Sequence, residues 1–245
     1  MDHLKEEETE KELIQKFFNG KKNGLFVEVG ANEPDLLLSQ TFHLEKHLNW
    51  EGILIEPIGY LCDKLRDKRP RAKTHQVACT SSEKVGEAIL RIPVENEIEI
   101  TGHAAIEINV DHSLLHETND IKVKAVTLNT IVEKEGVQKV DFLSIDVEGT
   151  ELDVLKGFDL WKYSPELIII EDRLVFLSKH IYLKKFGYQL FRRTGFNNWY
   201  VKSDKVPKTS FYTKMNLFRK IYLSSWIKRI RETFRMRTIK TFLRI

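Results

Sequence analysis

The chain has 245 residues and a net charge of +3, and 42% of its residues are hydrophobic. This length and composition suffice for one α/β domain with additions, and no apolar run approaches the roughly 20 residues that would span a bilayer. The acidic, polar N-terminus is unlike a signal peptide. Neither Cys62 nor Cys79 lies in a CxxC pattern, so a disulfide framework or a structural zinc is not expected. A reducing, cytoplasmic compartment is therefore favoured.

The charge is distributed unevenly along the chain. Residues 205–245 contain twelve Lys and Arg and a single acid, Glu232, which gives this segment a charge of +11. The first 204 residues therefore carry −8. The basic tail is expected to be physically distinct from the body.

Apolar runs and helical patterns alternate over the first 80 residues. A leading helix is expected over residues 4–19. The predicted strands are 25–29, 52–56 and 73–78, and the predicted helices between them are 39–48, capped by Ser39, and 58–68, which ends before Pro70.

Residues 80–120 are interpreted as an irregular insertion that covers a substrate, with an added strand at 88–92. Regular alternation returns afterwards. The expected elements are a strand at 121–126, a helix at 127–134, a strand at 140–145, a helix at 150–157, a strand at 167–170, a helix at 174–186 and an antiparallel pair at 188–192 and 199–202. Strands separated by helices imply right-handed crossovers and a parallel sheet.

Polar groups follow four of the predicted parallel strands. In open α/β sheets, ligands bind outside the carboxyl ends of the strands. A glycine there lets the backbone approach a ligand, and a carboxylate can accept hydrogen bonds from ribose hydroxyls. The alternative is that such acids cap the following helices, and for Asp172 alone both interpretations stay open. The groups are Gly30 and Asn32, Glu56, Asp146 and Glu148, and Glu171 and Asp172.

The first of these turns is unlike a dinucleotide-binding loop. Residues 30–35 contain one glycine instead of the three in G-x-G-x-x-G, and they add the acids Glu33 and Asp35. Such a turn would repel a diphosphate, but it tolerates a cofactor without phosphate. S-adenosylmethionine is one such cofactor.

Several motifs resemble the FkbM-type methyltransferases. They are residues 26–32, 39–42, 50–57 and 140–158, and the resemblance extends over roughly residues 24–203. One departure is Pro34-Asp35, where many members carry a glycine after an acidic residue.

The resemblance implies an α/β, class I methyltransferase fold: a Rossmann-like three-layer sandwich whose mostly parallel seven-stranded sheet ends in an antiparallel strand. The expected organisation is an N-terminal helical extension (1–24), a methyltransferase domain (25–203) and a basic amphipathic helical tail (204–245). The implied reaction is S-adenosylmethionine-dependent O-methylation, with a sugar, glycan or natural-product hydroxyl as acceptor.

The resemblance also assigns roles to residues of the cofactor site. Gly30 would lie under the methionine part of S-adenosylmethionine, and Glu28 and Asn32 would hold its amino and carboxylate groups. Glu56 would bind the ribose. Ala78 and Cys79, at the end of the third strand, would flank the adenine. Ser39 and Asp146 complete the cofactor-binding set.

Methyl transfer needs no acid for the leaving group, but an acceptor hydroxyl has to lose its proton. A carboxylate or histidine near the sulfonium can accept it. Asp146 is the first candidate base and Glu148 the second. His103 is the third, if the insertion folds over the site; otherwise it is a histidine of a surface loop.

A magnesium site is a further hypothesis. Asp146, Glu171 and Asp172 would provide the oxygen ligands that Mg²⁺ prefers. The same acids could instead cap helices or bind the acceptor.

The basic tail has an amphipathic pattern. Apolar residues recur at helical spacing with cations between them, which suits an anionic membrane surface or an acidic partner, here through residues 215–240. The alternative is a helix packed on the acidic body. No nucleic-acid-binding module is recognised. The apolar residues are Leu223, Trp226, Ile227, Ile230 and Phe234.

Two other functions compete with the enzyme hypothesis. The first is a catalytically inactive, methyltransferase-like binding protein that docks through its tail to a membrane or an acidic partner. Its best support is the unusual turn at Glu33-Pro34-Asp35. A nicotinamide-dependent oxidoreductase is the weaker rival, because the phosphate-binding loop is missing.

Overall fold

The computed structural model describes residues 9–34, 39–106, 117–172, 176–208, 210–223, 226–227 and 230. The chain divides into two compact units, Met1–Ile168 and Ile169–Ile245. We call them the first and second unit and describe each by itself.

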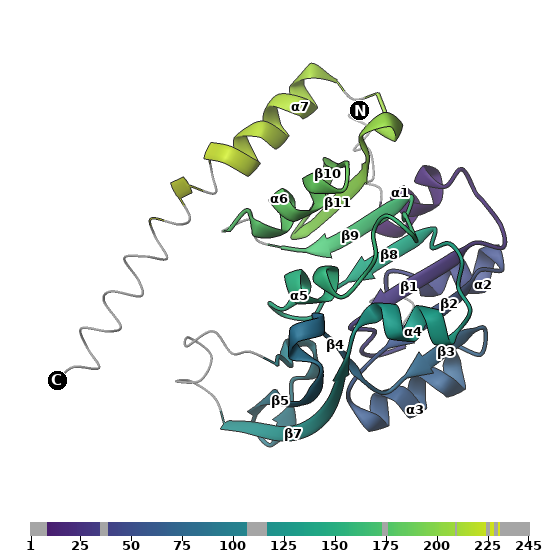
Figure 1. The fold of residues 1–245 in the computed structure, drawn as a ribbon, viewed down its shortest axis with the longest axis vertical. Coiled ribbons are helices and arrows are strands. Elements are labelled where there is room, and N and C mark those ends of the chain that lie inside the picture. Colours follow the sequence, from purple (N-terminus) through teal and green to yellow (C-terminus); the bar gives the residue numbers. More distant parts are fainter. Residues whose placement is uncertain are drawn as a thin grey trace, which may run out of the picture. The chain divides into compact units, whose positions relative to one another are not determined.

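Four parallel strands form the sheet of the first unit. They are β1 (Leu25–Val29), β2 (Glu51–Ile55), β3 (Ala72–His75) and β8 (Phe142–Ile145), in the order β8-β1-β2-β3 (Figure 1). β1 lies between β2 and β8, with Val27 opposite both Ile53 and Leu143. These strands are nearly continuous apolar runs because both faces of a parallel sheet are covered.

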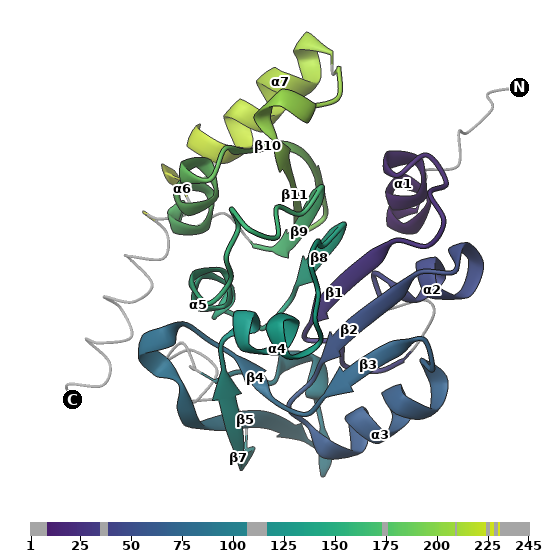
Figure 2. The same cartoon turned by 45° about the vertical axis from the view of Figure 1, so that its right-hand side comes forward.

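The helices of the first unit precede, connect or follow these strands. They are α1 (Glu10–Phe17), α2 (Phe42–Leu48), α3 (Gly59–Lys68), α4 (Leu128–Lys134) and α5 (Glu151–Lys156). Thr9 and Glu12 form a capping box that starts α1. Parallel neighbours need a crossover, and α2 and α3 supply it from β1 to β2 and from β2 to β3. α3 lies alongside β3 (Figure 2).

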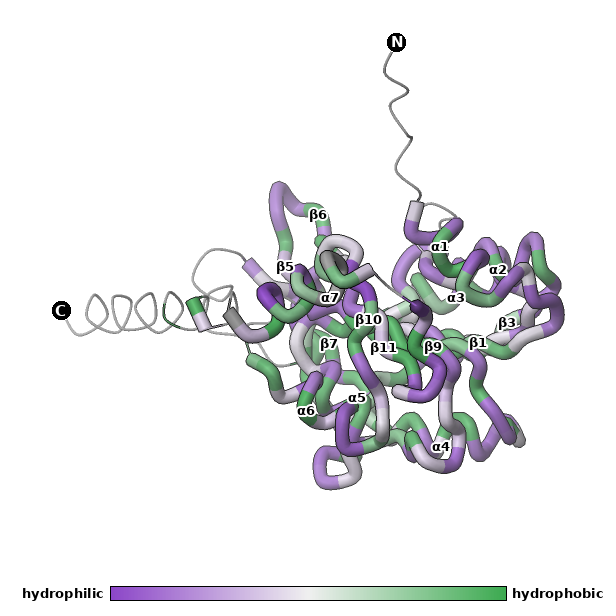
Figure 3. The backbone as a smooth tube through the Cα atoms, turned by 90° about the horizontal axis from the view of Figure 1, so that it is seen from above, coloured by the Kyte–Doolittle hydropathy of each residue, from purple (hydrophilic) through white to green (hydrophobic). Residues whose placement is uncertain are grey.

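The segment interpreted as an irregular insertion contains regular β-structure. A second sheet has the order β4-β7-β5-β6, and the long strands β5 and β7 pair in antiparallel register from Gly86 opposite Ala125 to Val94 opposite Glu117. The tip between β5 and β6 is hydrophilic (Figure 3). The elements are β4 (Ala78–Cys79), η1 (Ser82–Lys84), β5 (Gly86–Glu95), β6 (Ile98–Glu99), η2 (Thr101–His103) and β7 (Glu117–Val126).

The predicted third strand, 73–78, is wrong at its end. β3 stops at His75, and the Val77 amide donates to the His75 carbonyl at 3.1 Å, which turns the chain out of the sheet. Ala78 and Cys79 then pair in parallel with Ala125 and Val126 of β7. The stretch that was predicted as one strand therefore contributes to two sheets.

The second unit contains the remaining described elements. β10 and β11 pair in antiparallel register, and β11 neighbours β9. The elements are β9 (Leu167–Glu171), whose first two residues belong to the first unit, α6 (Ser178–Lys185), β10 (Tyr188–Thr194), β11 (Asn197–Lys202), η3 (Ser203–Lys205), α7 (Phe211–Phe218) and the π-helical η4 (Arg219–Leu223).

The predicted α/β class is confirmed, but the predicted sheet needs correction. Among the described residues, the strands β8, β1, β2 and β3 of the first unit pair in parallel, whereas β10 and β11 of the second unit pair in antiparallel register, so the strand pairing is mixed rather than mostly parallel. β10 and β11 are joined by two residues only, Gly195 and Phe196, and so short a connection permits an antiparallel hairpin but no crossover. The separate four-stranded sheet was not predicted.

Candidate cofactor site

A cavity of about 360 Å³ lies in the first unit, at the carboxyl ends of β1, β2 and β8. Its volume falls in the range of small-molecule and cofactor pockets. The strand-end residues named from the sequence for β1, β2 and β8 line it, whereas Glu171 and Asp172 are not among its lining residues. The cavity is lined, among others, by Glu28, Gly30, Asn32, Ser39, Glu56, Ala78, Cys79, Asp146 and Glu148.

The turn after β1 packs tightly against its neighbours. Gly30 has a φ of +83°, and a Cβ at this position would collide with the carbonyl oxygen of Asp146. The amides of Gly30 and Ala31 both donate to the Ile55 carbonyl, at 3.0 and 3.1 Å. Glycine is therefore required here by the adjoining strand end and by the left-handed backbone, in addition to any approach of a ligand.

Asn32 connects this turn to two other segments. Its backbone is also left-handed, with a φ of +48°. Its amide donates to Oε2 of Glu56 at 2.8 Å, and its side-chain carbonyl accepts from the Thr101 hydroxyl at 3.0 Å. The turn after β1 is thus tied to the end of β2 and to η2 of the second sheet.

Glu56 places a buried carboxylate at the end of β2. Its oxygens accept from the amides of Asn32 and Ile58, at 2.8 and 2.9 Å. Burial raises the pKa of Glu56 above its ordinary value, although the two amide donors favour the ionised form. A carboxylate has about four lone-pair sites, so two amide donors leave room for hydroxyl groups of a ligand.

Glu28 is also buried, and its partners come from the start of α2. It accepts from the hydroxyl of Ser39 at 3.1 Å, from the amide of Gln40 at 3.0 Å and from the hydroxyl of Thr41 at 2.6 Å. Ser39 in turn accepts from the amide of Phe42 at 3.1 Å, but the predicted start of this helix at Ser39 is wrong, because α2 begins at Phe42 and its N-cap residue is Thr41. Glu28 therefore fixes the entry to α2 as well as lining the cavity.

A buried arginine that no sequence pattern marks contacts the cluster formed by Glu28, Ser39 and Thr41. Arg69 is fully buried and lies 3.7 Å from Oε2 of Glu28. It donates to Glu45 at 2.5 Å and to the hydroxyls of Ser39 and Thr41 at 3.2 and 2.9 Å. In the sequence, Arg69 is one of several cations before Pro70, and nothing there distinguishes it.

One wall of the cavity is mostly apolar. Val77, Ala78 and Cys79 contribute from the stretch that enters β4, and Leu90 and Ile106 from the second sheet. Burial raises the pKa of the Cys79 thiol, so this side chain stays protonated and behaves as a small apolar group. A flat aromatic base fits such a wall.

The turn after β8 presents the two candidate bases. Asp146 is exposed, and its amide donates to the Val29 carbonyl at 2.9 Å. Glu148 and Gly149 follow with φ values of +53° and +121°, and Gly149 donates its amide to Glu151 at 2.7 Å. Strained backbone of this kind is concentrated at functional sites.

The third candidate base does not line the cavity, and two of the metal candidates belong to the second unit. His103 is an exposed residue of η2, and its neighbours Gly102 and Ala104, but not His103, line the cavity. Glu171 and Asp172 belong to the second unit, where Asp172 is buried 3.4 Å from the Lys179 ammonium. The catalytic role of His103 and the magnesium set stay predictions.

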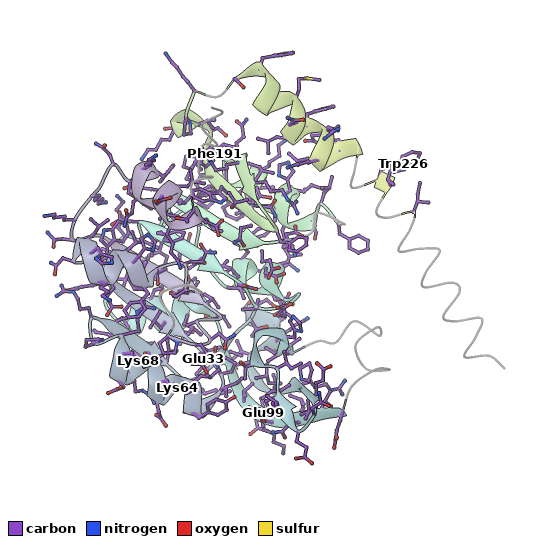
Figure 4. The ribbon with its side chains drawn as sticks, turned by 180° about the vertical axis from the view of Figure 1, so that it is seen from behind. Glu33, Lys64, Lys68, Glu99, Phe191 and Trp226 are labelled. Carbon is purple, nitrogen blue, oxygen red and sulfur yellow. The ribbon has the colours of Figure 1, made fainter. Side chains whose placement is uncertain are left out.

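The turn at residues 30–35 contains the acid Glu33, whose negative charge is paired with a cation. Glu33 lines the cavity, and its carboxylate lies 2.6 Å from the Lys64 ammonium of α3 (Figure 4). Asp35, the other acid of this turn, lies outside the described residues.

This geometry is typical of one class of protein: an α/β domain that binds its ligand at the carboxyl ends of parallel strands. A family model described as "Methyltransferase FkbM domain" matches residues 28–190. The chain therefore belongs to the FkbM methyltransferase family. A search among curated proteins finds no match.

Proposed function

We propose that the protein is an S-adenosylmethionine-dependent O-methyltransferase and that its cofactor binds in the cavity of the first unit. The observation that carries the proposal is the cavity itself: the residues assigned to the cofactor from separate motifs all line it. Glu56 has lone pairs available for ribose hydroxyls, and the apolar wall at Ala78 and Cys79 suits an adenine.

The residues of this chain would bind the cofactor, orient the acceptor and deprotonate the hydroxyl group of the acceptor. S-adenosylmethionine supplies an activated methyl group when it is bound. Asp146 or Glu148, both on the cavity wall, accepts the proton of the acceptor hydroxyl. The acceptor that we propose is a hydroxyl of a sugar, a glycan or a natural product.

Calorimetry with S-adenosylmethionine tests this proposal. The wild-type protein should bind with micromolar affinity. Glu56→Gln should weaken binding about 10- to 100-fold, because hydrogen bonds to a charged group contribute about 1.5–3 kcal/mol each. Glu51→Gln is a matched control, since Glu51 is exposed at the other end of the same strand.

The control should bind as tightly as the wild type. Absence of binding heat in the wild-type protein would show that the cofactor assignment is wrong. Equal affinity of Glu56→Gln and wild type would mean that the ribose is held elsewhere.

A further inference from the structure

Helix α7 and the π-helical turn η4 of the second unit carry apolar residues on two different faces. Leu217 and Ile221, four residues apart, turn inward: Ile221 is only 6% exposed and Leu217 is half-buried. α7 also contacts β10. One apolar face is therefore used for packing within the unit.

The other face is a stripe of large exposed side chains, which we call the α7 stripe. Its members are four or three residues apart, the spacing of one helix face. Phe211 is 79% exposed and Trp226 is 65% exposed, and Figure 4 labels Trp226 at the far end of the stripe. The α7 stripe consists of Phe211, Met215, Phe218, Tyr222 and Trp226.

Cations accompany the α7 stripe. Arg219 and Lys220 are exposed beside it, as are Lys205 and Lys208 before α7. The segment 205–245 as a whole carries +11. Large apolar and aromatic side chains next to cations suit the boundary between lipid headgroups and acyl chains. Each Lys or Arg near an anionic leaflet contributes about 1 kcal/mol.

We propose that the α7 stripe and its flanking cations dock this protein on an anionic lipid surface, with α7 lying along that surface. Within the described ranges, no helix has the length and hydropathy to cross a bilayer, so the contact that we propose is peripheral. This proposal does not depend on the cofactor assignment.

Vesicle sedimentation with the full chain tests the proposal. The protein should pellet with vesicles of phosphatidylcholine mixed with phosphatidylglycerol, should stay in the supernatant with phosphatidylcholine alone, and should be released by salt. A variant with Phe211, Met215, Phe218 and Trp226 changed to Ser should lose at least 10-fold in partitioning. Tyr222 is kept because its ring lies 6.3 Å from that of His180.

The matched control removes four exposed apolar side chains that lie outside the α7 stripe. A variant with Val85, Ile89, Ile98 and Ile181 changed to Ser should sediment like the wild type. If the stripe variant misfolds, the double variant Arg219→Gln, Lys220→Gln provides a second test and should sediment less with anionic vesicles.

Two results would overturn the proposal. One is no sedimentation of the wild type with anionic vesicles, which would favour an acidic protein partner. The other is a dimer in analytical ultracentrifugation that the stripe substitutions abolish while vesicle binding is unchanged, which would assign the stripe to a second copy of the chain.

Discussion

At the scale of single residues, the most consequential side chain is Arg69. It is a buried cation between two buried carboxylates, Glu28 and Glu45, and it lies over the rings of Phe26 and Phe42, at 5.5 and 4.5 Å. A buried charge is tolerated only when it is paired and hydrogen-bonded. This cluster therefore holds the start of α2 against β1, next to the cavity.

Removing the cation alone should be costly. Arg69→Met leaves two buried carboxylates without their counter-ion, and we expect the free energy of unfolding to fall by about 3–5 kcal/mol. Urea denaturation measures this change. Arg66→Met is the matched control, because Arg66 is exposed in the same helix and pairs only at the surface, so it should cost less than about 1 kcal/mol. Equal losses for the two variants would show that the buried cluster does not stabilise the fold.

At the scale of elements, the sequence predicted best the strands that are buried on both faces. β1, β2, β8 and β9 lie within two residues of their predicted bounds, because apolar runs mark such strands directly. β7 begins at Glu117, four residues before the predicted strand, since its first half is largely exposed and polar. No local signal shows that Ala78 and Cys79 leave the main sheet, because only the pairing with β7 decides this.

Helix α2 contains a second unusual group, His43. This side chain is 4% exposed, and neither ring nitrogen has a hydrogen-bond partner within the described part of the chain. Burial, with Lys11, His47 and Arg69 nearby, lowers the pKa of His43 from 6.5 to about 4. The folded protein therefore keeps His43 neutral where the unfolded chain would protonate it.

The sign of the resulting pH dependence follows from this difference. The pKa is lowered on folding, so stability is fully present above pH 6.5 and is lost as the pH falls from 6.5 to 4. Between pH 6.5 and 4, the free energy of unfolding of His43→Leu should decrease by up to about 3 kcal/mol less than that of the wild type. Urea denaturation across this pH range measures the difference. His47→Leu, at an exposed position of the same helix, should retain most of the dependence, because burial is the main cause of the lowered pKa of His43 and His47 is a smaller one. If the stability of His43→Leu decreased with falling pH as much as that of the wild type, His43 would not be the cause of the pH dependence.

At the scale of the whole molecule, site residues that follow strands could be predicted from topology and Glu28 and Ser39 from the family resemblance, whereas Thr101 and Arg69 could not be predicted. The carboxyl ends of parallel strands meet at one edge, so Gly30, Glu56 and Asp146 were placed together by topology alone. Thr101 reaches the site through the second sheet, and Arg69 stands behind it from the end of α3. Their positions depend on tertiary contacts that no local pattern encodes.

The uneven distribution of charge bears on whether the basic tail packs on the acidic body or docks on a membrane. A body of −8 and a tail segment of +11 could attract each other, which the sequence left as an alternative to membrane docking. Within the second unit, however, Leu217 of α7 is half-buried and Ile221 of η4 is buried, while the α7 stripe is exposed. The stripe therefore needs an explanation other than packing of α7 on β10.

The central claim is that the cavity at the ends of β1, β2 and β8 holds the methyl donor. A crystal structure with S-adenosylhomocysteine tests it most directly. We expect electron density for the ligand inside this cavity, with the ribose hydroxyls within hydrogen-bond distance of Glu56 and the adenine against Ala78 and Cys79. Ligand density outside the cavity, or a ribose that does not contact Glu56, would contradict it.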